Sequence, residues 1–144
     1  MTMAQESPGG RPSGFRLAVE RLFQRYVEGF DDFDTEKVLD CFAYPVTIWQ
    51  LGKGTVFADS DELAENVEAL FEVFEHEEIA HSSFHVVEAT SWSNAALVAL
   101  SWTQERRDGD VAMEFECRYA LRRNDLSGEW LIALVINEEE VSPR

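Results

Sequence analysis

Three histidines lie close together in the sequence and are the first side chains to consider for chemistry. They are His76, His81 and His85, and the last two share one face of an expected strand. Strand residues four positions apart are separated by about 13 Å, from a rise of about 3.3 Å per residue, which is too far to chelate one ion together. We therefore expect no metal site.

A second group of candidates lies on a segment in which polar and apolar residues alternate, 111–122. One face of this segment is apolar and contains Val111, Met113, Phe115, Cys117, Tyr119 and Leu121. Glu114, Glu116 and Arg118 point the other way, so they form either a solvated face or ion pairs in a subunit interface. Tyr119 and Cys117 are thus expected to point inward, either into a pocket or into the packed core.

The sequence motifs of several functional classes are absent from this chain. It contains no Gly-rich phosphate loop, Ser-His-Asp elbow, HExxH motif, dinucleotide fingerprint or calcium loop, so we expect no cofactor. The 12 Lys and Arg against 28 Asp and Glu give a net charge of -16. Such a charge repels phosphate backbones and anionic lipid headgroups, and we expect neither a nucleic acid nor a membrane as partner.

The cysteines and the N-terminal sequence bear on the cellular compartment. Cys41 and Cys117 are far apart and form no CxxC pair, so the sequence indicates neither a zinc site nor a disulfide framework. The first residues contain no basic segment followed by an apolar one, and no charge-free apolar run reaches membrane-spanning length. We expect a cytoplasmic protein.

Hydrophobic periodicity predicts the elements that would position these side chains. Residues 1–14 are rich in Pro, Gly and Ser and are expected to form a flexible tail, followed by a single domain over 15–140. Apolar residues at three- and four-residue steps predict a helix over 15–30, a short helix that Thr35 would cap, and a third helix that Asp59 or Ser60 would cap.

The remaining sequence predicts strands. Short runs at 46–51 and 55–58 flank Gly52-Lys53-Gly54 and suggest a hairpin. Four longer segments predict an antiparallel meander, at 80–89, 95–106, 111–122 and 130–138. In the last segment both sets of alternating residues are apolar, so we expect helices to cover one sheet face and a partner subunit the other. This predicts an α+β fold with a cavity at the open end of a curved sheet.

The run RYVEGFD at 25–31 and the run DTEKVLDCFA at 34–43, taken with this element order, resemble the NTF2-like superfamily. That superfamily includes the SnoaL-like polyketide cyclases and the ketosteroid isomerases. The resemblance covers about Phe15 to Glu138. It implies a cone-shaped α+β fold in which about three N-terminal helices pack on a strongly curved, mostly antiparallel sheet. It also implies a deep apolar pocket and a homodimer through the outer sheet face.

The resemblance also suggests pocket residues. In the ketosteroid isomerases a Tyr on the first helix and a protonated acid on a late strand form the oxyanion hole, and an Asp at the end of the first strand is the general base. These positions match Tyr26, Tyr119 and Gln50, and Gln50 cannot take up a proton near neutral pH. An isomerase of that type is therefore not expected. Dehydratase-like members use a pocket histidine, which makes His85 a candidate.

The expected ligand pocket thus comprises Tyr26, Gln50, His85, Cys117 and Tyr119. We expect it to hold a small, largely apolar molecule, in a protein that either only binds it or acts as an isomerase, cyclase or hydrolase. One alternative is a non-catalytic module whose sheet binds a protein partner or builds an assembly. Another is a cone filled by its own Phe and Trp side chains.

Overall fold

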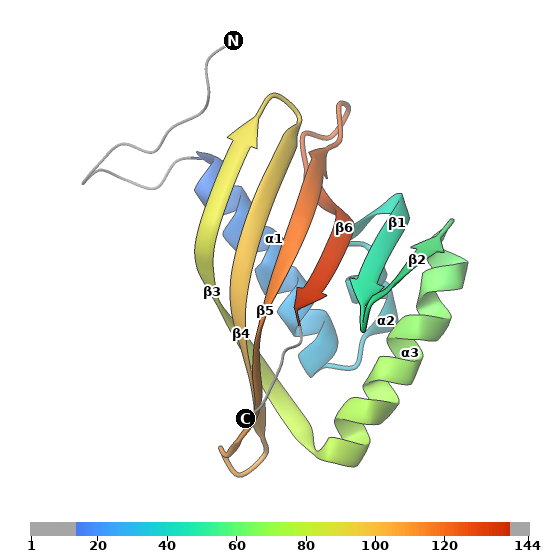
Figure 1. Cartoon of the computed structure of the whole chain (residues 1–144), viewed down its shortest axis with the longest axis vertical. Coiled ribbons are helices and arrows are strands. Elements are labelled where there is room, and N and C mark those ends of the chain that lie inside the picture. The colour runs from blue at the N-terminus through green and yellow to red at the C-terminus, as the bar shows by residue number, and fades with distance from the viewer. Residues whose placement is uncertain (1–13, 139–144) are drawn as a thin grey trace, which may run out of the picture.

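The structure, a computed structural model, describes residues 14–138 and consists of three helices and one six-stranded sheet (Figure 1). In chain order the elements are α1 (Gly14–Asp31), α2 (Thr35–Leu39), β1 (Phe42–Gln50), β2 (Lys53–Phe57), α3 (Ser60–Glu77), β3 (Ile79–Trp92), β4 (Ala95–Arg106), β5 (Val111–Arg123) and β6 (Trp130–Glu138). The α+β class and the order of the elements are confirmed. The tail expected at residues 1–14 falls, except for Gly14, outside the described residues.

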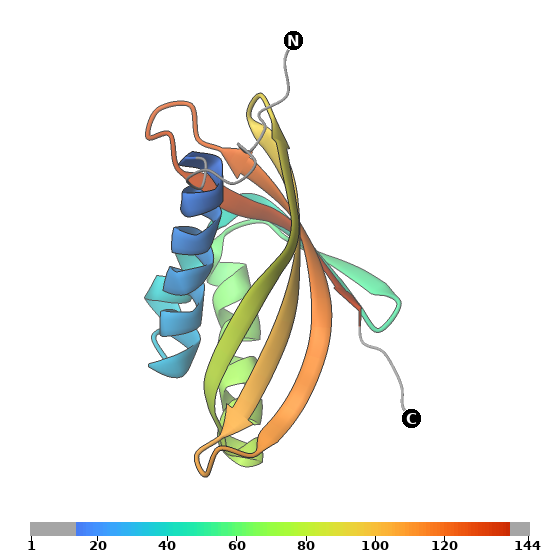
Figure 2. The ribbon, with the colours of Figure 1, turned by 90° about the vertical axis from the view of Figure 1, so that its left-hand side faces the viewer.

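The sheet has the strand order β2-β1-β6-β5-β4-β3. All neighbours pair antiparallel except β1 and β6, which run parallel. Register shifts interrupt the β1–β6, β3–β4, β4–β5 and β5–β6 pairs, and such bulges increase the local twist of a sheet. All three helices lie on one side of the sheet, and the lower parts of β3, β4 and β5 curve toward α3 (Figure 2).

The apolar stripe of α1 faces the concave side of the sheet. It buries Val19, Leu22, Phe23, Val27 and Phe30, at the three- and four-residue steps from which the helix was predicted. No helix within residues 14–138 is long and apolar enough to cross a membrane.

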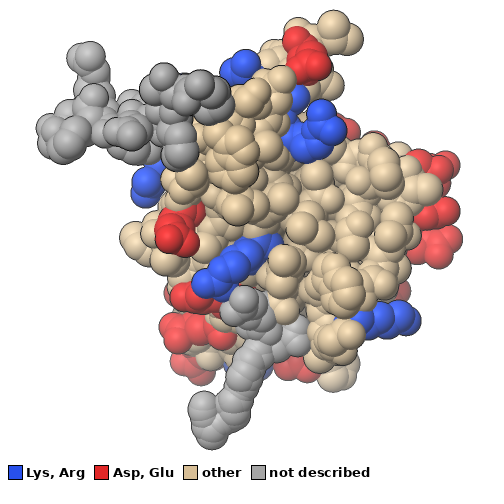
Figure 3. Space-filling view, turned by 45° about the horizontal axis from the view of Figure 1, so that its top comes forward, with Lys and Arg blue, Asp and Glu red and all other residues tan. Residues whose placement is uncertain are grey.

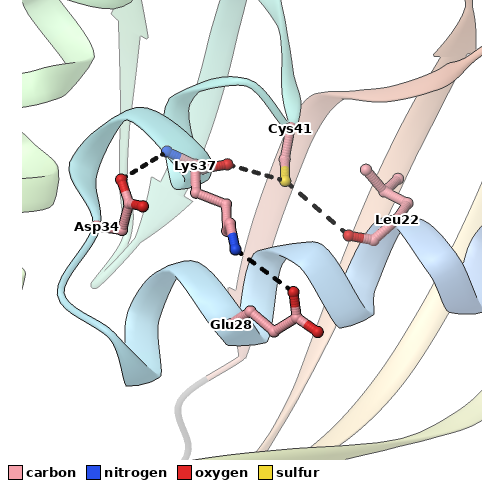
Figure 4. A network of polar contacts seen from close by, with 5 residues as sticks. All are labelled: Leu22, Glu28, Asp34, Lys37 and Cys41. Carbon is pink, nitrogen blue, oxygen red and sulfur yellow. Dashed lines mark hydrogen bonds and ion pairs between the residues drawn. The ribbon is translucent and has the colours of Figure 1, made fainter.

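The corner between α1, α2 and β1 is held by polar contacts around Lys37 and Cys41 (Figure 4). Lys37 Nζ lies 3.6 Å from Glu28 Oε1. The Cys41 thiol donates to the carbonyls of Lys37 and Leu22, at 3.5 and 3.9 Å. Burial raises the pKa of this thiol to about 11, so it stays protonated and unreactive near neutral pH.

The prediction of the N-cap of α2 was wrong by one position. Asp34, not Thr35, is the N-cap, because its backbone is extended and its Oδ1 accepts from the Lys37 amide at 3.2 Å. For α3, the structure selects Asp59 over Ser60. Asp59 accepts from the Glu62 amide at 3.0 Å, while Glu62 Oε1 accepts from the Ala58 amide at 2.8 Å.

The outer face of the sheet carries a row of apolar side chains. Strand register places Leu97, Ala120 and Leu134 side by side across β4, β5 and β6. A second row passes from Arg118 to Ile136 and on to Trp49 of β1. Leu97, Ile136 and Trp49 are exposed. In a view of this side with its top tipped forward, acidic side chains lie mostly toward the margins, while basic side chains also lie within a broad uncharged area (Figure 3).

Gly29 allows α1 and α2 to approach closely, which gives a test of this corner. A Cβ atom added to Gly29 would lie 2.6 Å from Val38 Cγ2 and 3.0 Å from the Val38 amide nitrogen. We therefore expect Gly29→Ala to lower the free energy of unfolding by about 1–3 kcal/mol, the usual cost of overpacking, as measured by urea denaturation. Gly14→Ala in the same helix is the control, because nothing lies within 4 Å of its added Cβ. Equal stability of the two variants would contradict this packing.

Candidate ligand-binding cavity

A cavity of about 990 Å³ lies between the concave face of the sheet and helices α1 and α3. Most of its lining side chains are apolar, among them Phe30, Leu70, Val73, Phe74, Met113 and Phe115. Leu70, Val73 and Met113 remain exposed although they line the inside of the fold. The volume is at the upper end of the range for small-molecule sites.

The inner end of the cavity is aromatic and contains two of the predicted residues, Tyr26 and Tyr119. Trp102 Nε1 donates to the Tyr119 hydroxyl at 2.8 Å, and both side chains are buried. The Tyr26 ring centre lies 6.0 Å from that of Trp102. The Tyr26 hydroxyl forms no hydrogen bond with another residue of the described chain, so it can bind a carbonyl or hydroxyl group in the cavity.

Burial keeps both of these tyrosines neutral. Desolvation is the largest cause that raises the pKa of Tyr26 and of Tyr119 well above the usual value, and the neighbouring Cys117 adds to it. Each phenol is therefore protonated throughout the physiological range. Tyrosines held in this state act as hydrogen-bond donors and not as proton acceptors.

Cys117 and Gln50 also line the cavity, at different depths. Cys117 is buried on the inner face of β5, opposite Leu100 of β4 and Asn137 of β6. Gln50 is the last residue of β1 and is exposed at the rim. Four of the five predicted residues, Tyr26, Gln50, Cys117 and Tyr119, thus surround one space.

His85 does not line the cavity, and its prediction as a pocket residue was wrong. On β3 the side chains of Ser82 and Val86 are buried on the inner side, whereas His85 lies between them in the alternation, is exposed and pairs with Ser101 of β4. Phe84 and Val86 are apolar on the inward side, but the exposed Val87 is apolar as well, so the sequence alone did not show which side is covered.

His81 has a structural contact instead. Its Nδ1 lies 3.0 Å from Asp31 Oδ2, and Asp31 Oδ1 accepts from the Ser82 amide at 3.0 Å. Burial raises the pKa of Asp31, and the hydrogen bonds from Ser82 and His81 oppose that shift. The contact ties the end of α1 to the beginning of β3, beside the cavity.

Three polar strand residues that line the cavity were not predicted from the sequence: Ser82, Gln104 and Asn137. Ser82 Oγ and Asn137 Oδ1 are buried and have no hydrogen-bond partner among the described residues. Each of the three stands at the inward position of its strand's alternation, where the other residues are mainly apolar. A polar residue at an inward, otherwise apolar position of a strand is the sequence feature that could have identified them.

The family described as NTF2-like protein (DUF6841) matches residues 16–140. The chain belongs to this NTF2-like family. None of the curated proteins matches the sequence.

The NTF2-like fold is also evident from solved structures. A protein of unknown function with a cystatin-like fold from Nostoc punctiforme has a TM-score of 0.71 at 18% identity, over 90% of this chain and 95% of that one. An NTF-2 like protein of unknown function from Shewanella oneidensis has a TM-score of 0.67 at 17% identity, over 85% and 97%. A ketosteroid isomerase-like protein from Erwinia carotovora atroseptica has a TM-score of 0.66 at 20% identity, over 88% and 96%. At these identities the NTF2-like fold is shown and no activity is.

The neutral tyrosines predict how the stability of this NTF2-like protein depends on alkaline pH. The folded-state pKa of Tyr26 and Tyr119 lies above the unfolded value, and that of Tyr44 is raised to about 12, mainly by burial. Their contribution is complete below pH about 10 and falls as pH rises further, by up to about 1.4 kcal/mol per pH unit for each of Tyr26 and Tyr119, and by less for the more exposed Tyr44.

Denaturant unfolding at a series of alkaline pH values, with tyrosinate absorbance followed in parallel, measures this dependence. We expect the folded protein to show no tyrosinate signal near pH 10, and Tyr44, whose pKa is about 12, to ionise before Tyr26 and Tyr119. Tyr119→Phe should make the fall in stability less steep. Ionisation of all three tyrosines in the folded protein near pH 10 would contradict their burial.

Proposed function

We propose that this NTF2-like protein binds a small, largely apolar molecule in its cavity. The observation that carries the proposal is a large, open cavity whose wall leaves Leu70, Val73 and Met113 exposed. Apolar side chains that line a concave surface gain from contact with an apolar ligand, because that contact removes their surface from water. The Tyr26 hydroxyl can orient one polar group of such a molecule.

The polar groups in the cavity favour binding over carbon-acid chemistry. The carboxylates among its lining residues are Glu77, Glu114 and Glu116, all exposed. Glu116 pairs with Arg118 at 3.8 Å, and Glu77 pairs with Arg106 at 3.5 Å. A reaction of the isomerase, cyclase or hydrolase type would have to use polarisation by neutral donors such as Tyr26.

Substitution of Val73 tests the binding proposal. N-phenyl-1-naphthylamine is an uncharged probe whose fluorescence rises in apolar sites, and we expect saturable binding to the native protein. Val73→Gln places an amide in the apolar wall and should weaken this binding about 5- to 10-fold, from the apolar contact it removes. Val73 is 50% exposed, so little stability should be lost.

Val87→Gln is the matched control for that substitution. Val87 is 49% exposed on β3 and does not line the cavity. We expect its affinity for the probe to equal that of the native protein. A native protein that gives no saturable fluorescence increase, or equal losses in both variants, would contradict binding in the cavity.

We also propose that two copies associate through the outer sheet face. The exposed Leu97, Ile136 and Trp49 lie on one face of the sheet, on β4, β6 and β1, with β5 between β4 and β6. β6 is apolar on both faces. Each copy carries a net charge of -16, so an interface that avoids the acidic margins reduces repulsion between the copies.

The buried thiols of Cys41 and Cys117 suit a reducing cytoplasm, and we propose that the protein is cytoplasmic.

Substitution of Leu97 tests the dimer. Leu97 is 55% exposed, and Leu97→Glu should convert a native dimer to a monomer, because a carboxylate would be buried without a partner. Light scattering coupled to size-exclusion chromatography measures the mass. Leu126→Glu is the control, since Leu126 is 98% exposed in the β5–β6 loop. A monomeric native protein would contradict the dimer and favour the alternative, a module whose sheet face binds a different protein.

A further inference from the structure

We propose that Ser82 and Gln104 form a polar subsite that selects a neutral group able both to donate and to accept hydrogen bonds, such as a carboxamide, on an otherwise apolar ligand. The inference rests on the proposed binding function and specifies which ligand the cavity prefers. Both residues line the cavity. They are direct cross-strand partners on β3 and β4, so their side chains lie next to each other on the inner face.

Ser82 supplies a hydroxyl that forms no hydrogen bond with any residue in 14–138. The residue is 4% exposed, and its Oγ is buried with no partner. A buried hydroxyl without a partner costs free energy, and the hydroxyl rotates to meet a new partner. The Ser82 backbone amide, by contrast, is bound to Asp31 Oδ1 at 3.0 Å, so the position of the residue is fixed.

Gln104 supplies an amide on β4, directly opposite Ser82 of β3. It is 8% exposed, and its side chain forms no hydrogen bond with another residue in 14–138. It stands two residues beyond Trp102 on the inner face of β4, about 7 Å along the strand. A ligand that reaches Tyr26 and Trp102 with one end can therefore place a second polar group at Ser82 and Gln104.

The charge around the cavity selects against an anionic group. The ionisable Asp, Glu, Lys, Arg and His residues among the lining of the described cavity are Glu77, Glu114 and Glu116, all acidic. A carboxylate that entered would lose its hydration without gaining a cation, in a protein of net charge -16. An amide or a hydroxyl needs only the donor and acceptor that Ser82 and Gln104 each provide.

Competition experiments with matched probes test the subsite. Naphthalene, naphthalene-2-carboxamide and naphthalene-2-carboxylate differ only in the polar group, and each is titrated against bound N-phenyl-1-naphthylamine. In the native protein we expect the carboxamide to bind at least about 10-fold tighter than the carboxylate. The ratio of carboxamide to naphthalene affinity should fall about 5- to 10-fold in Ser82→Ala and in Gln104→Leu, because each removes a hydrogen-bond partner.

Ser83→Ala is the control, since Ser83 is exposed on the outer face of the same strand and does not line the cavity. Its affinity ratio should match that of the native protein. An unchanged affinity ratio in both Ser82→Ala and Gln104→Leu would overturn the subsite, and so would a carboxylate that binds as tightly as the carboxamide. If naphthalene still bound in either case, the proposed cavity function would stand without the subsite. Failure of the native protein to bind N-phenyl-1-naphthylamine would overturn the proposed function and the subsite with it.

Discussion

The packing of α1 into the concave face of the sheet is the constraint on which the rest of the structure depends. Phe23, which is fully buried, lies at its centre. Its ring contacts those of Tyr119 and Phe84, with ring centres 4.7 and 6.1 Å apart. These contacts join α1 to β5 and β3 and fill the narrow end of the fold, so the sheet has to curve around the helix.

The cavity follows from how α3 is supported. Phe71 and Phe74 of α3 pack against Phe30 of α1, with ring centres 5.5 and 5.6 Å away, and Phe71 also stacks on Phe33 at 5.1 Å. Because α3 rests on α1, its Leu70 and Val73 face the open space before the sheet and stay exposed. Leu70 and Val73 are thus exposed on the cavity wall and contribute little to this packing, so substitutions there can change the ligand without loss of the fold.

The fold could be predicted from the sequence because its cues are local. The three- and four-residue steps of α1 and the alternation of β5 each identify an element without knowledge of its neighbours. The candidate site could be predicted only in part. Tyr26 and Tyr119 fall on apolar faces and point inward, whereas the position of His85 depended on which face of β3 is covered, and alternation alone does not determine that. For Ser82 and Gln104 the only local cue to a pocket role was their inward position in the alternation of β3 and β4. The cavity beside them exists only once α1, α3 and the sheet are assembled.

The central claim is that the cavity holds a small apolar molecule, and native mass spectrometry tests it most directly. The protein would be purified untagged from its own host, and its native mass would be compared with its denatured mass. We expect a non-covalent adduct of a few hundred daltons on each protomer that is lost on denaturation, and its identification would reveal the ligand class. A native mass equal to that of the bare chains would contradict the account.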